Sequence, residues 1–482
     1  MALVSPHMST VPGDLSTDVQ PPLAIPLRHF LVGLAFLLAG AVAMLWTTGT
    51  RAAGGATPPF ARVATVHLLL VGWVAITILG AVTQFVPVWS GVRIHSRRLA
   101  SLQLLLVAGG VPGLAGALWL GRPAAGVPFA LAMVLGVAVF GYNVARTLLA
   151  ARPWDATEAH FALALGFFAA AIALATALAL DFRAAVFPAA GVTRTSAIAA
   201  HATLAVFGGV LTTIAGALYQ LGPMFTQSDP EAFDDRLRRL ESVALPVGVV
   251  LLAGGRLVAS VPTAVVGGVL VATASVALGW FLLRRVRRAT GTRTPMLPRY
   301  GVVALALLAW GLTAGAAWLR AATGAPGPGV LDPALRFGVP SAGPVLLFAA
   351  IGFVVAGTLY HVVPFLIWVH RYADRVGLEP VPTIDDLTGE RLARGDLVAT
   401  VGGTTLVLAA ATGDLVGVDA PPGLALAGLL LAALGLAAFL ANLLRVVVIH
   451  APDAAGLPPR FLPFDAADPS AEPMDDSDRR ES

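Results

Sequence analysis

The stretch HLLLVGWVAITILGAVTQFVPVW, residues 67–89, contains no Asp, Glu, Lys or Arg. A bilayer core about 30 Å thick is crossed by a helix of about 20 apolar residues, so this stretch predicts a transmembrane helix. Its second half, GAVTQFVPVW from Gly80, returns as GALYQLGPMF from Gly216 and GTLYHVVPFL from Gly357. Each copy places Gln or His four residues after the glycine, and proline three residues later. The recurrence indicates a repeated membrane unit.

The composition of the chain is that of a polytopic membrane protein. Of its 482 residues, 57% are hydrophobic and 12% are charged, whereas soluble domains average about 25% charged residues. The absence of cysteine excludes disulfides, Cys-ligated iron–sulfur clusters and covalent haem attachment within this chain. The arginines fall in short loops, where membrane topology explains them. The predicted partner is therefore the lipid bilayer and not nucleic acid.

The length criterion predicts an all-α fold with about twelve transmembrane helices. They are 30–46, 64–89, 99–120, 124–149, 161–180, 197–225, 243–261, 264–283, 302–319, 344–369, 397–415 and 424–448. A single membrane domain, 29–450, is expected between an N-terminal tail, 1–28, and a disordered acidic tail, 451–482. The boundary between the seventh and eighth helices is the weakest, since only Ser260 to Thr263 separates them.

The distribution of arginine predicts the orientation of the chain. Arginines are concentrated in the loops at 93–98, 236–239, 284–299 and 371–394, whereas the alternate loops hold few. Positively charged loops stay in the cytoplasm. With an even number of helices, both termini lie on the same side as these loops. The sequence predicts a multi-pass protein of the plasma membrane with cytoplasmic N- and C-termini.

The three similar segments that begin at Gly80, Gly216 and Gly357 are called the recurring phrase below, and their spacing favours three four-helix units. Its glycines are 216 − 80 = 136 and 357 − 216 = 141 residues apart, which is four predicted helices in each case. A second similarity links LGVAVFGYNVARTLL (135–149) to LGLAAFLANLLRVVV (434–448). The units are expected at about 29–150, 159–288 and 299–450. This pattern disfavours a transporter built from two six-helix halves.

Two histidines are candidate cofactor ligands. His67 and His201 lie near the outward-facing starts of corresponding helices, and they fall two positions apart when the recurring phrases are superposed. A histidine within a membrane span indicates a functional site, although one satisfied by a neighbouring helix is the alternative. Gly72 and Gly208 coincide in this superposition and would admit either a flat ligand or a neighbouring helix.

The remaining histidines predict less chemistry. His361 takes the place of Gln84 and Gln220, and all three precede a proline by three residues. We interpret this arrangement as helix-end architecture, in which the polar side chain satisfies backbone groups freed by a proline kink. His29 and His160, at the cytoplasmic starts of two helices, are interpreted as interfacial.

Twelve helices in three units, and a histidine near the outer end of the second helix, resemble subunit I of the haem–copper oxidase superfamily. The segments HLLLVGWVAITILGAVTQFVPVWSG and HATLAVFGGVLTTIAGALYQLGPMF resemble sequences of the divergent branch of this superfamily, near the C-type oxidase catalytic subunits and NnrS-like haem proteins. The resemblance implies a cytochrome c oxidase subunit I-like fold. It also implies a low-spin haem ligated by His67, and it places His201 in the helix that carries a copper ligand.

The motifs of the copper centre are missing. AHATL lacks the family's His-Pro-Glu-Val-Tyr type motif, the seventh helix has no His-His pair, and the tenth begins GPVLLFAAIG without a haem-ligating histidine. Oxygen reduction by the family mechanism is therefore not expected, nor is bound copper. Two hypotheses remain. The chain binds a b-type haem through His67 and His201, for electron transfer with a redox partner or for handling nitric oxide or oxygen. Alternatively, it is a haemless permease or assembly component.

Overall fold

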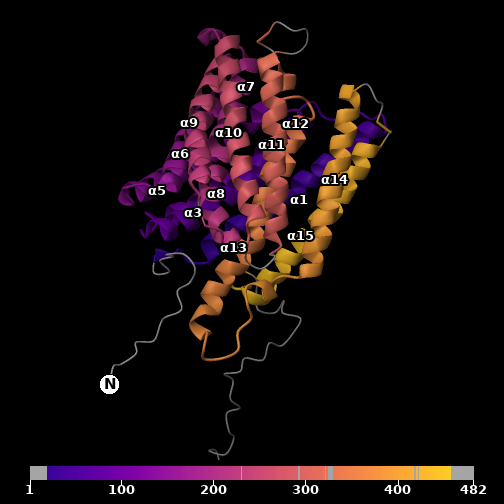
Figure 1. The fold of residues 1–482 in the computed structure, drawn as a ribbon. Helices are drawn as coiled ribbons and strands as arrows, with labels where there is room; N and C mark the ends of the chain where they lie inside the picture. The colour runs from indigo at the N-terminus through magenta and orange to yellow at the C-terminus, as the bar shows by residue number, and fades with distance from the viewer. Residues whose placement is uncertain are drawn as a thin grey trace, which may run out of the picture.

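The computed structural model describes residues 19–456, except for 230, 291–293, 321, 324–328, 417–419 and 422. Within this part of the chain the fold is helical, without a strand, and twelve helices are long and apolar enough to cross a membrane (Figure 1). Each of the twelve predicted spans coincides with one of these helices. Residues 1–18 and 457–482, which hold most of the two predicted tails, lie outside the described residues.

Nine spans are formed by one main helix each. These are α1 (Ala24–Ala52), α4 (Arg97–Trp119), α5 (Val127–Ala150), α6 (Ala156–Leu180), α9 (Ala232–Leu257), α10 (Val261–Arg287), α11 (Met296–Arg320), α14 (Glu390–Val416) and α15 (Leu424–His450). A break between the seventh and eighth spans is present, but it lies earlier than the predicted Ser260 to Thr263, because α9 ends at Leu257 and α10 begins at Val261.

The other three spans carry the recurring phrase, and each contains a π-helical segment between two α-helical ones. They are α2 (Ala61–Val66), η2 (His67–Ala75) and α3 (Ile76–Ser90); α7 (Arg194–Thr203), η5 (Leu204–Leu211) and α8 (Thr212–Thr226); and α12 (Ala342–Pro344), η7 (Val345–Gly352) and α13 (Phe353–Arg371). Each π segment ends five residues before the glycine of the phrase: 80 − 75, 216 − 211 and 357 − 352. Because π-helix is rare and is frequent at functional sites, these three spans are the first candidates for a functional site.

Close helix contacts depend on glycine. A Cβ at Gly267 of α10 would lie 2.2 Å from the backbone nitrogen of Leu252 on α9. At Gly403 of α14, a Cβ would lie 2.4 Å from the carbonyl oxygen of Gly428 on α15. Membrane helices pack without a hydrophobic driving force between them, so close approach through small residues supplies much of their association.

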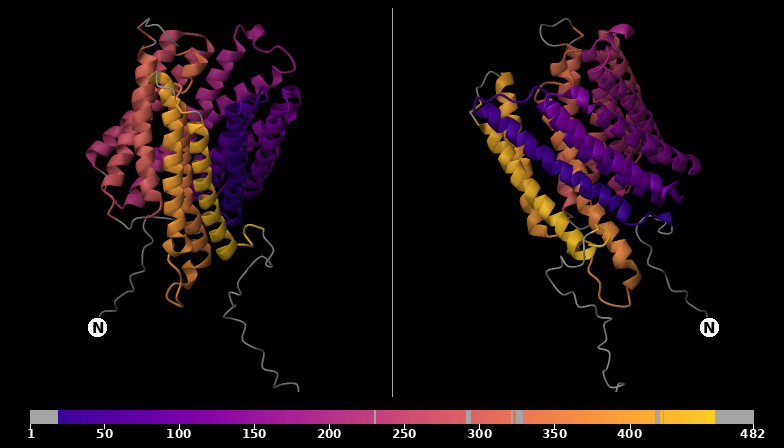
Figure 2. Two further views of the ribbon diagram at one scale, coloured as in Figure 1. Left: turned by 90° about the vertical axis from the view of Figure 1, so that its right-hand side faces the viewer. Right: turned by 180° about the vertical axis from the view of Figure 1, so that it is seen from behind.

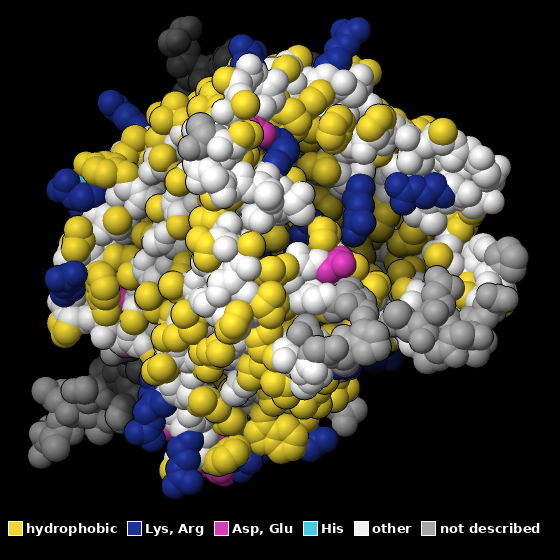
Figure 3. Space-filling view, turned by 90° about the horizontal axis from the view of Figure 1, so that it is seen from above, with side chains coloured by type: hydrophobic (Ala, Val, Ile, Leu, Met, Phe, Trp, Pro, Cys, Tyr) yellow, Lys and Arg dark blue, Asp and Glu magenta, His cyan; other side chains and the backbone are white. Residues whose placement is uncertain are grey.

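The first and last helices place the described ends of the chain at one end of the bundle. In Figure 2, α1 begins and α15 ends at the lower end of the molecule. Viewed onto the opposite end (Figure 3), arginine side chains project around the rim, with hydrophobic side chains between them. The position of both chain ends at the same end of the bundle is the one expected of an even number of spans.

Candidate functional site

The glycine of each recurring phrase makes room for a polar residue of a neighbouring helix. A Cβ at Gly80 would lie 2.5 Å from Cβ of His29 on α1, and one at Gly216 would lie 2.6 Å from Cβ of His160 on α6. The glycine at 357 faces Cβ of Arg299 on α11 at 3.2 Å. All three polar side chains are no more than 2% exposed. Each therefore needs a buried hydrogen-bond partner.

His29 is satisfied by its own helix and by one neighbouring helix. Its Nδ1–H donates to the carbonyl of Ile25 at 2.8 Å, and its Nε2 accepts from Nε2 of Gln103 on α4 at 3.3 Å. The same amide nitrogen donates to the hydroxyl of Thr83, three residues after Gly80, also at 3.3 Å. Gln103 and Thr83 are fully buried. The result is a neutral hydrogen-bonded network that joins α1, α3 and α4.

The second network contains a buried carboxyl group. Nε2 of His160 lies 3.0 Å from Oε2 of Glu241 on α9, and the hydroxyl of Tyr219 donates to the same oxygen at 2.8 Å. The His160 Nδ1 also faces an acceptor, the carbonyl of Ala156 at 2.6 Å. Because both ring nitrogens face oxygen atoms that can accept a hydrogen bond, Nδ1 carries a proton. A second proton lies either on Nε2 or on the Glu241 carboxyl. The pair is therefore neutral overall, either as imidazolium and carboxylate or as imidazole and carboxylic acid.

The third network is a buried ion pair. Arg299 pairs with Asp396 on α14, and the hydroxyl of Tyr360 donates to the second carboxylate oxygen. Arg299 also donates to the carbonyl of Ala393 at 2.9 Å. Asn442 on α15 donates to the Tyr360 hydroxyl at 3.5 Å and so extends the network to a fourth helix. The guanidinium and the carboxylate are 2% and 3% exposed.

Two asparagines hold the loops that precede α4 and α14. The side-chain amide of Asn143 accepts from the Ser96 N–H at 2.8 Å and donates to the Ser96 carbonyl at 3.0 Å. Asn442 makes the same two bonds with Gly389, at 2.8 and 2.9 Å. In the corresponding place before α9, Arg285 donates to the carbonyl of Ser228 at 2.9 Å.

Sequence reasoning missed these networks. His29 and His160 are buried and hydrogen-bonded, so their interpretation as interfacial side chains is wrong. Two partners, Glu241 and Asp396, fell outside the predicted spans because α9 and α14 begin 11 and 7 residues earlier than predicted, at Ala232 instead of 243 and at Glu390 instead of 397. The available signal was the residue three positions after each glycine, which is Thr, Tyr and Tyr in the three copies.

The Gln or His four residues after each glycine takes no part in these networks. Among the described residues, no hydrogen bond involves the side chain of Gln84, Gln220 or His361, so the predicted role of satisfying backbone groups at a kink is not supported. Gln84 is 1% exposed. The His361 ring instead packs edge-on against Phe225, with ring centres 4.3 Å apart.

His67 and His201 occupy related environments near the starts of their spans. Nδ1 of His67 donates to the carbonyl of Val63 at 2.9 Å, and Nδ1 of His201 donates to the carbonyl of Ala171 at 3.0 Å. Both side chains are half-buried. A proton fixed on Nδ1 leaves Nε2 as a lone-pair donor, which is the arrangement of a metal-ligating imidazole. No group of three or more potential ligands occurs among the described residues.

Gly72 and Gly208 do not border an open slot. A Cβ at Gly72 would lie 2.7 Å from Cβ and Cγ of Phe36 on α1. The contact of Gly208 with Phe167 on α6 is the same, at 2.7 Å to both atoms. Of the two predicted alternatives, a flat ligand or a neighbouring helix, the structure places a neighbouring helix at both glycines.

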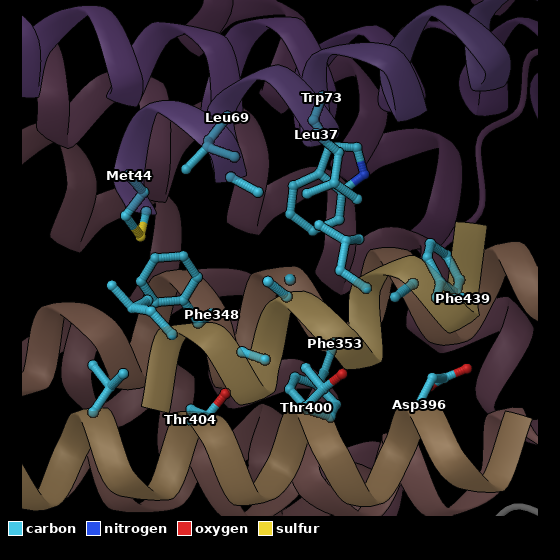
Figure 4. Close-up of a pocket in the computed structure, with 18 of the residues that line it drawn as sticks. Leu37, Met44, Leu69, Trp73, Phe348, Phe353, Asp396, Thr400, Thr404 and Phe439 are labelled. Carbon is cyan, nitrogen blue, oxygen red and sulfur yellow. The ribbon is translucent and has the colours of Figure 1, made fainter. Parts of the chain in front are cut away.

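A cavity of about 150 Å³ lies between α1, η2, α11, η7, α13, α14 and α15 (Figure 4). Its wall is mostly aliphatic and aromatic, and the Arg299–Asp396 pair forms part of it. Trp73 reaches it from η2, and Thr400 and Thr404 reach it from α14 on the opposite side. Neither His67 nor His201 lines this cavity.

A smaller cavity of about 70 Å³ lies where the three phrase-bearing spans meet. It is bordered by α3, α8 and α13, with Thr77, Thr213 and Thr358 as its polar lining residues. Neither cavity contains a cluster of acids or histidines among the described residues.

No protein-family model matches the chain, and no curated protein matches its sequence.

Proposed function

We propose that this membrane protein binds a b-type haem through His67 and His201 and uses it in electron transfer or in handling a small gas such as nitric oxide or oxygen. The observation that carries the proposal is that the two imidazoles are held in the same way on corresponding helices. Each Nδ1 is held by a backbone carbonyl, and each Nε2 is left as a lone-pair donor. Bound haem would supply the one-electron chemistry. His67 and His201 would fix its position near the outer end of the second and sixth spans.

The proposal includes a fold of three four-helix units of the cytochrome c oxidase subunit I-like type. It is supported by the threefold recurrence of the π segment, of the glycine contact and of the buried polar network on corresponding helices. The proposed location is the plasma membrane with both termini cytoplasmic, supported by the arginine-rich loops. Copper is not part of the proposal, because the motifs of the family's copper centre are missing from the sequence.

A second function, a haemless permease or assembly component, is favoured by a different observation. Phe36 and Phe167 fill the space beside Gly72 and Gly208, where a macrocycle between the two spans would need room. Haem binding through both histidines would therefore require these phenylalanines to turn away.

Absorption spectra of the purified protein, oxidised and dithionite-reduced, distinguish the two functions. The haem proposal expects a reduced α-band that is lost or shifted in His67→Ala and in His201→Ala, with normal membrane insertion. His361→Ala is the matched control, because its ring packs against Phe225 instead of facing the pair. A colourless wild-type protein, expressed with ample haem, would overturn the haem proposal in favour of the haemless function. Elemental analysis is expected to find no stoichiometric copper.

A further inference from the structure

We infer that the start of α4 and the end of α5, which lie together at one end of the bundle, form a binding site for an anionic phospholipid. Its headgroup would lie against four arginines, and its acyl chains along the exposed apolar sides of the same two helices. The arginines are Arg93, Arg97 and Arg98, before and at the start of α4, and Arg146, near the end of α5. They are called the basic edge below. None of them is a proposed haem ligand, so the inference does not rest on the proposed function.

Hydrogen bonds hold the two parts of the basic edge together. The side-chain amide of Asn143 on α5 binds both backbone groups of Ser96, which precedes α4. One residue earlier, the backbone N–H of His95 donates to the hydroxyl of Thr147 on α5 at 3.1 Å. The arginines on either side of these two residues are therefore fixed beside the end of α5 that carries Arg146.

The positive charge of the basic edge is not neutralised within the described part of the chain. None of its four arginines forms an ion pair with a carboxylate there. Arg146 contacts a neutral partner instead, because its Nη1 donates to the hydroxyl of Tyr142 at 3.3 Å. The acids that follow α5, Asp155 and Glu158, form the capping box of α6. A guanidinium has five N–H donors, so Arg146 has further donors for an anion.

Other arginines at this end of the bundle are neutralised by acids of the chain. Arg284 on α10 lies 2.9 Å from Asp234 and 2.7 Å from Glu231. On α14, Arg394 pairs with Glu390. A positive loop by itself is what membrane topology requires. A group of arginines without acids, beside helices that face lipid, is in addition suited to an anion that the membrane supplies.

The exposed sides of α4 and α5 continue from the arginines as apolar surface. Residues spaced by three, four or seven positions share one face of a helix. Exposed residues in this register are Arg98, Leu102 and Leu105 on α4, and Arg146, Tyr142 and Leu135 on α5. Figure 1 shows α5 at the outside of the bundle. Charge at the membrane edge followed by apolar surface is the order of phosphate and acyl chains in a phospholipid. A soluble acidic protein would match only the charge.

The arrangement selects a headgroup with a net negative charge. The phosphate of phosphatidylcholine is balanced by its own choline, which neighbouring guanidinium groups would repel. Phosphatidylglycerol carries the same phosphate without a cation, and guanidinium groups bind phosphate oxygens through paired N–H donors. The ligand class is therefore an anionic phospholipid, whichever side of the membrane this end of the bundle faces.

The test is native mass spectrometry of the purified full-length protein in a mild detergent, titrated with dioleoyl phosphatidylglycerol or dioleoyl phosphatidylcholine. We expect the first phosphatidylglycerol to bind more tightly than the first phosphatidylcholine. The double variant Arg98→Gln, Arg146→Gln should lower the affinity for phosphatidylglycerol about 25-fold, which is about fivefold for each arginine near a membrane surface. Its affinity for phosphatidylcholine should stay the same, which shows that the variant is folded and still binds lipid.

The matched control removes the same charge from the opposite end of the bundle. Arg122, after the end of α4, and Arg320, at the end of α11, are both exposed. The double variant Arg122→Gln, Arg320→Gln should keep the wild-type preference for phosphatidylglycerol. An equal loss of this preference in the two double variants would overturn the site, because binding would then follow net charge alone. Equal wild-type affinities for the two lipids would also overturn it.

Two further measurements identify the occupant. Glycerol phosphate, which has the phosphate without acyl chains, should not displace phosphatidylglycerol, and displacement would overturn the lipid in favour of a soluble phosphate ester. The acidic C-terminal tail is the other candidate. Replacing Asp475, Asp476 and Asp478 by Asn should leave the affinity for phosphatidylglycerol unchanged. Binding of phosphatidylglycerol in this variant alone would show that the tail, and not a lipid, occupies the basic edge of the native chain.

Discussion

Asp396 is a single carboxylate on which several buried groups depend. It accepts from Arg299 and from Tyr360, and all three are at most 3% exposed. Removing one partner of a buried ion pair leaves the other charge uncompensated, which is more costly than removing both.

We expect Asp396→Ala to lower the free energy of unfolding by about 3–5 kcal/mol, measured from the thermal unfolding midpoint in detergent. The double variant Arg299→Met, Asp396→Leu should lose less than Asp396→Ala alone. Glu390→Ala is the control, since its exposed pair with Arg394 should contribute less than about 1 kcal/mol. Equal midpoints for Asp396→Ala and Glu390→Ala would contradict the structural role of the pair.

Asn442 is expected to control the loop in front of α14. Asn442→Ala removes both bonds to Gly389 and leaves a backbone donor and acceptor without these partners, at about 1–3 kcal/mol for each group that stays buried. Faster amide exchange at residues 386–390, measured by mass spectrometry, is the expected result. Thr405→Val, which removes a hydroxyl bonded within its own helix, should leave this loop unchanged. Amide exchange at the wild-type rate in Asn442→Ala would show that the two hydrogen bonds to Gly389 do not hold this loop.

At the scale of elements, two of the π segments each place a glycine against a phenylalanine of a neighbouring helix. Gly72 lies within η2 and contacts Phe36, and Gly208 lies within η5 and contacts Phe167. A Cβ at either glycine would lie 2.7 Å from Cβ and Cγ of its phenylalanine. The sequence contained the glycine pair but gave no indication of the π geometry, since hydrophobic periodicity in an entirely apolar run does not report the helix type.

Gly208→Ala is expected to destabilise the bundle by about 1–3 kcal/mol, because the new methyl would overlap Phe167 and force a shift between packed helices. Gly116→Ala on α4 is its matched control. No atom lies within 4 Å of a Cβ there, so helix propensity alone should make it neutral or slightly stabilising. Combining Gly208→Ala with Phe167→Ala should cost less than the sum of the two single changes, measured by thermal unfolding in a double-mutant cycle. Additive changes would mean that the two residues do not compete for space.

At the scale of the whole molecule, the arginine distribution predicts topology. Reporter fusions after residues 240 and 290 should read as cytoplasmic, and fusions near residues 190 and 330 as external. The measurement is paired alkaline phosphatase and green fluorescent protein fusions. An external reading for the loop at 284–299 would reverse the proposed orientation.

Hydropathy sufficed to predict all twelve helices, because a membrane span must be long and apolar wherever it occurs. It did not predict the buried polar networks. Glu241 and Asp396 lie near helix starts, where an apolar window ends too early, and their partners Tyr219 and Tyr360 are too apolar to interrupt a span. Partner choice across helices is a tertiary property. His67 and His201 remain predicted ligands, chosen because histidine is rare inside a membrane span.

The pairing of each first helix with its third also affects how the chain is made. The partners are 74, 81 and 97 residues apart in sequence, for His29 with Gln103, His160 with Glu241 and Arg299 with Asp396. At a synthesis rate of about 5–20 residues per second, Arg299 is synthesised about 5–20 s before its partner Asp396. A nascent chain that stops after residue 290 has both earlier networks complete. One that stops after residue 320 holds an unpaired arginine, and pulse-chase labelling should find it degraded faster.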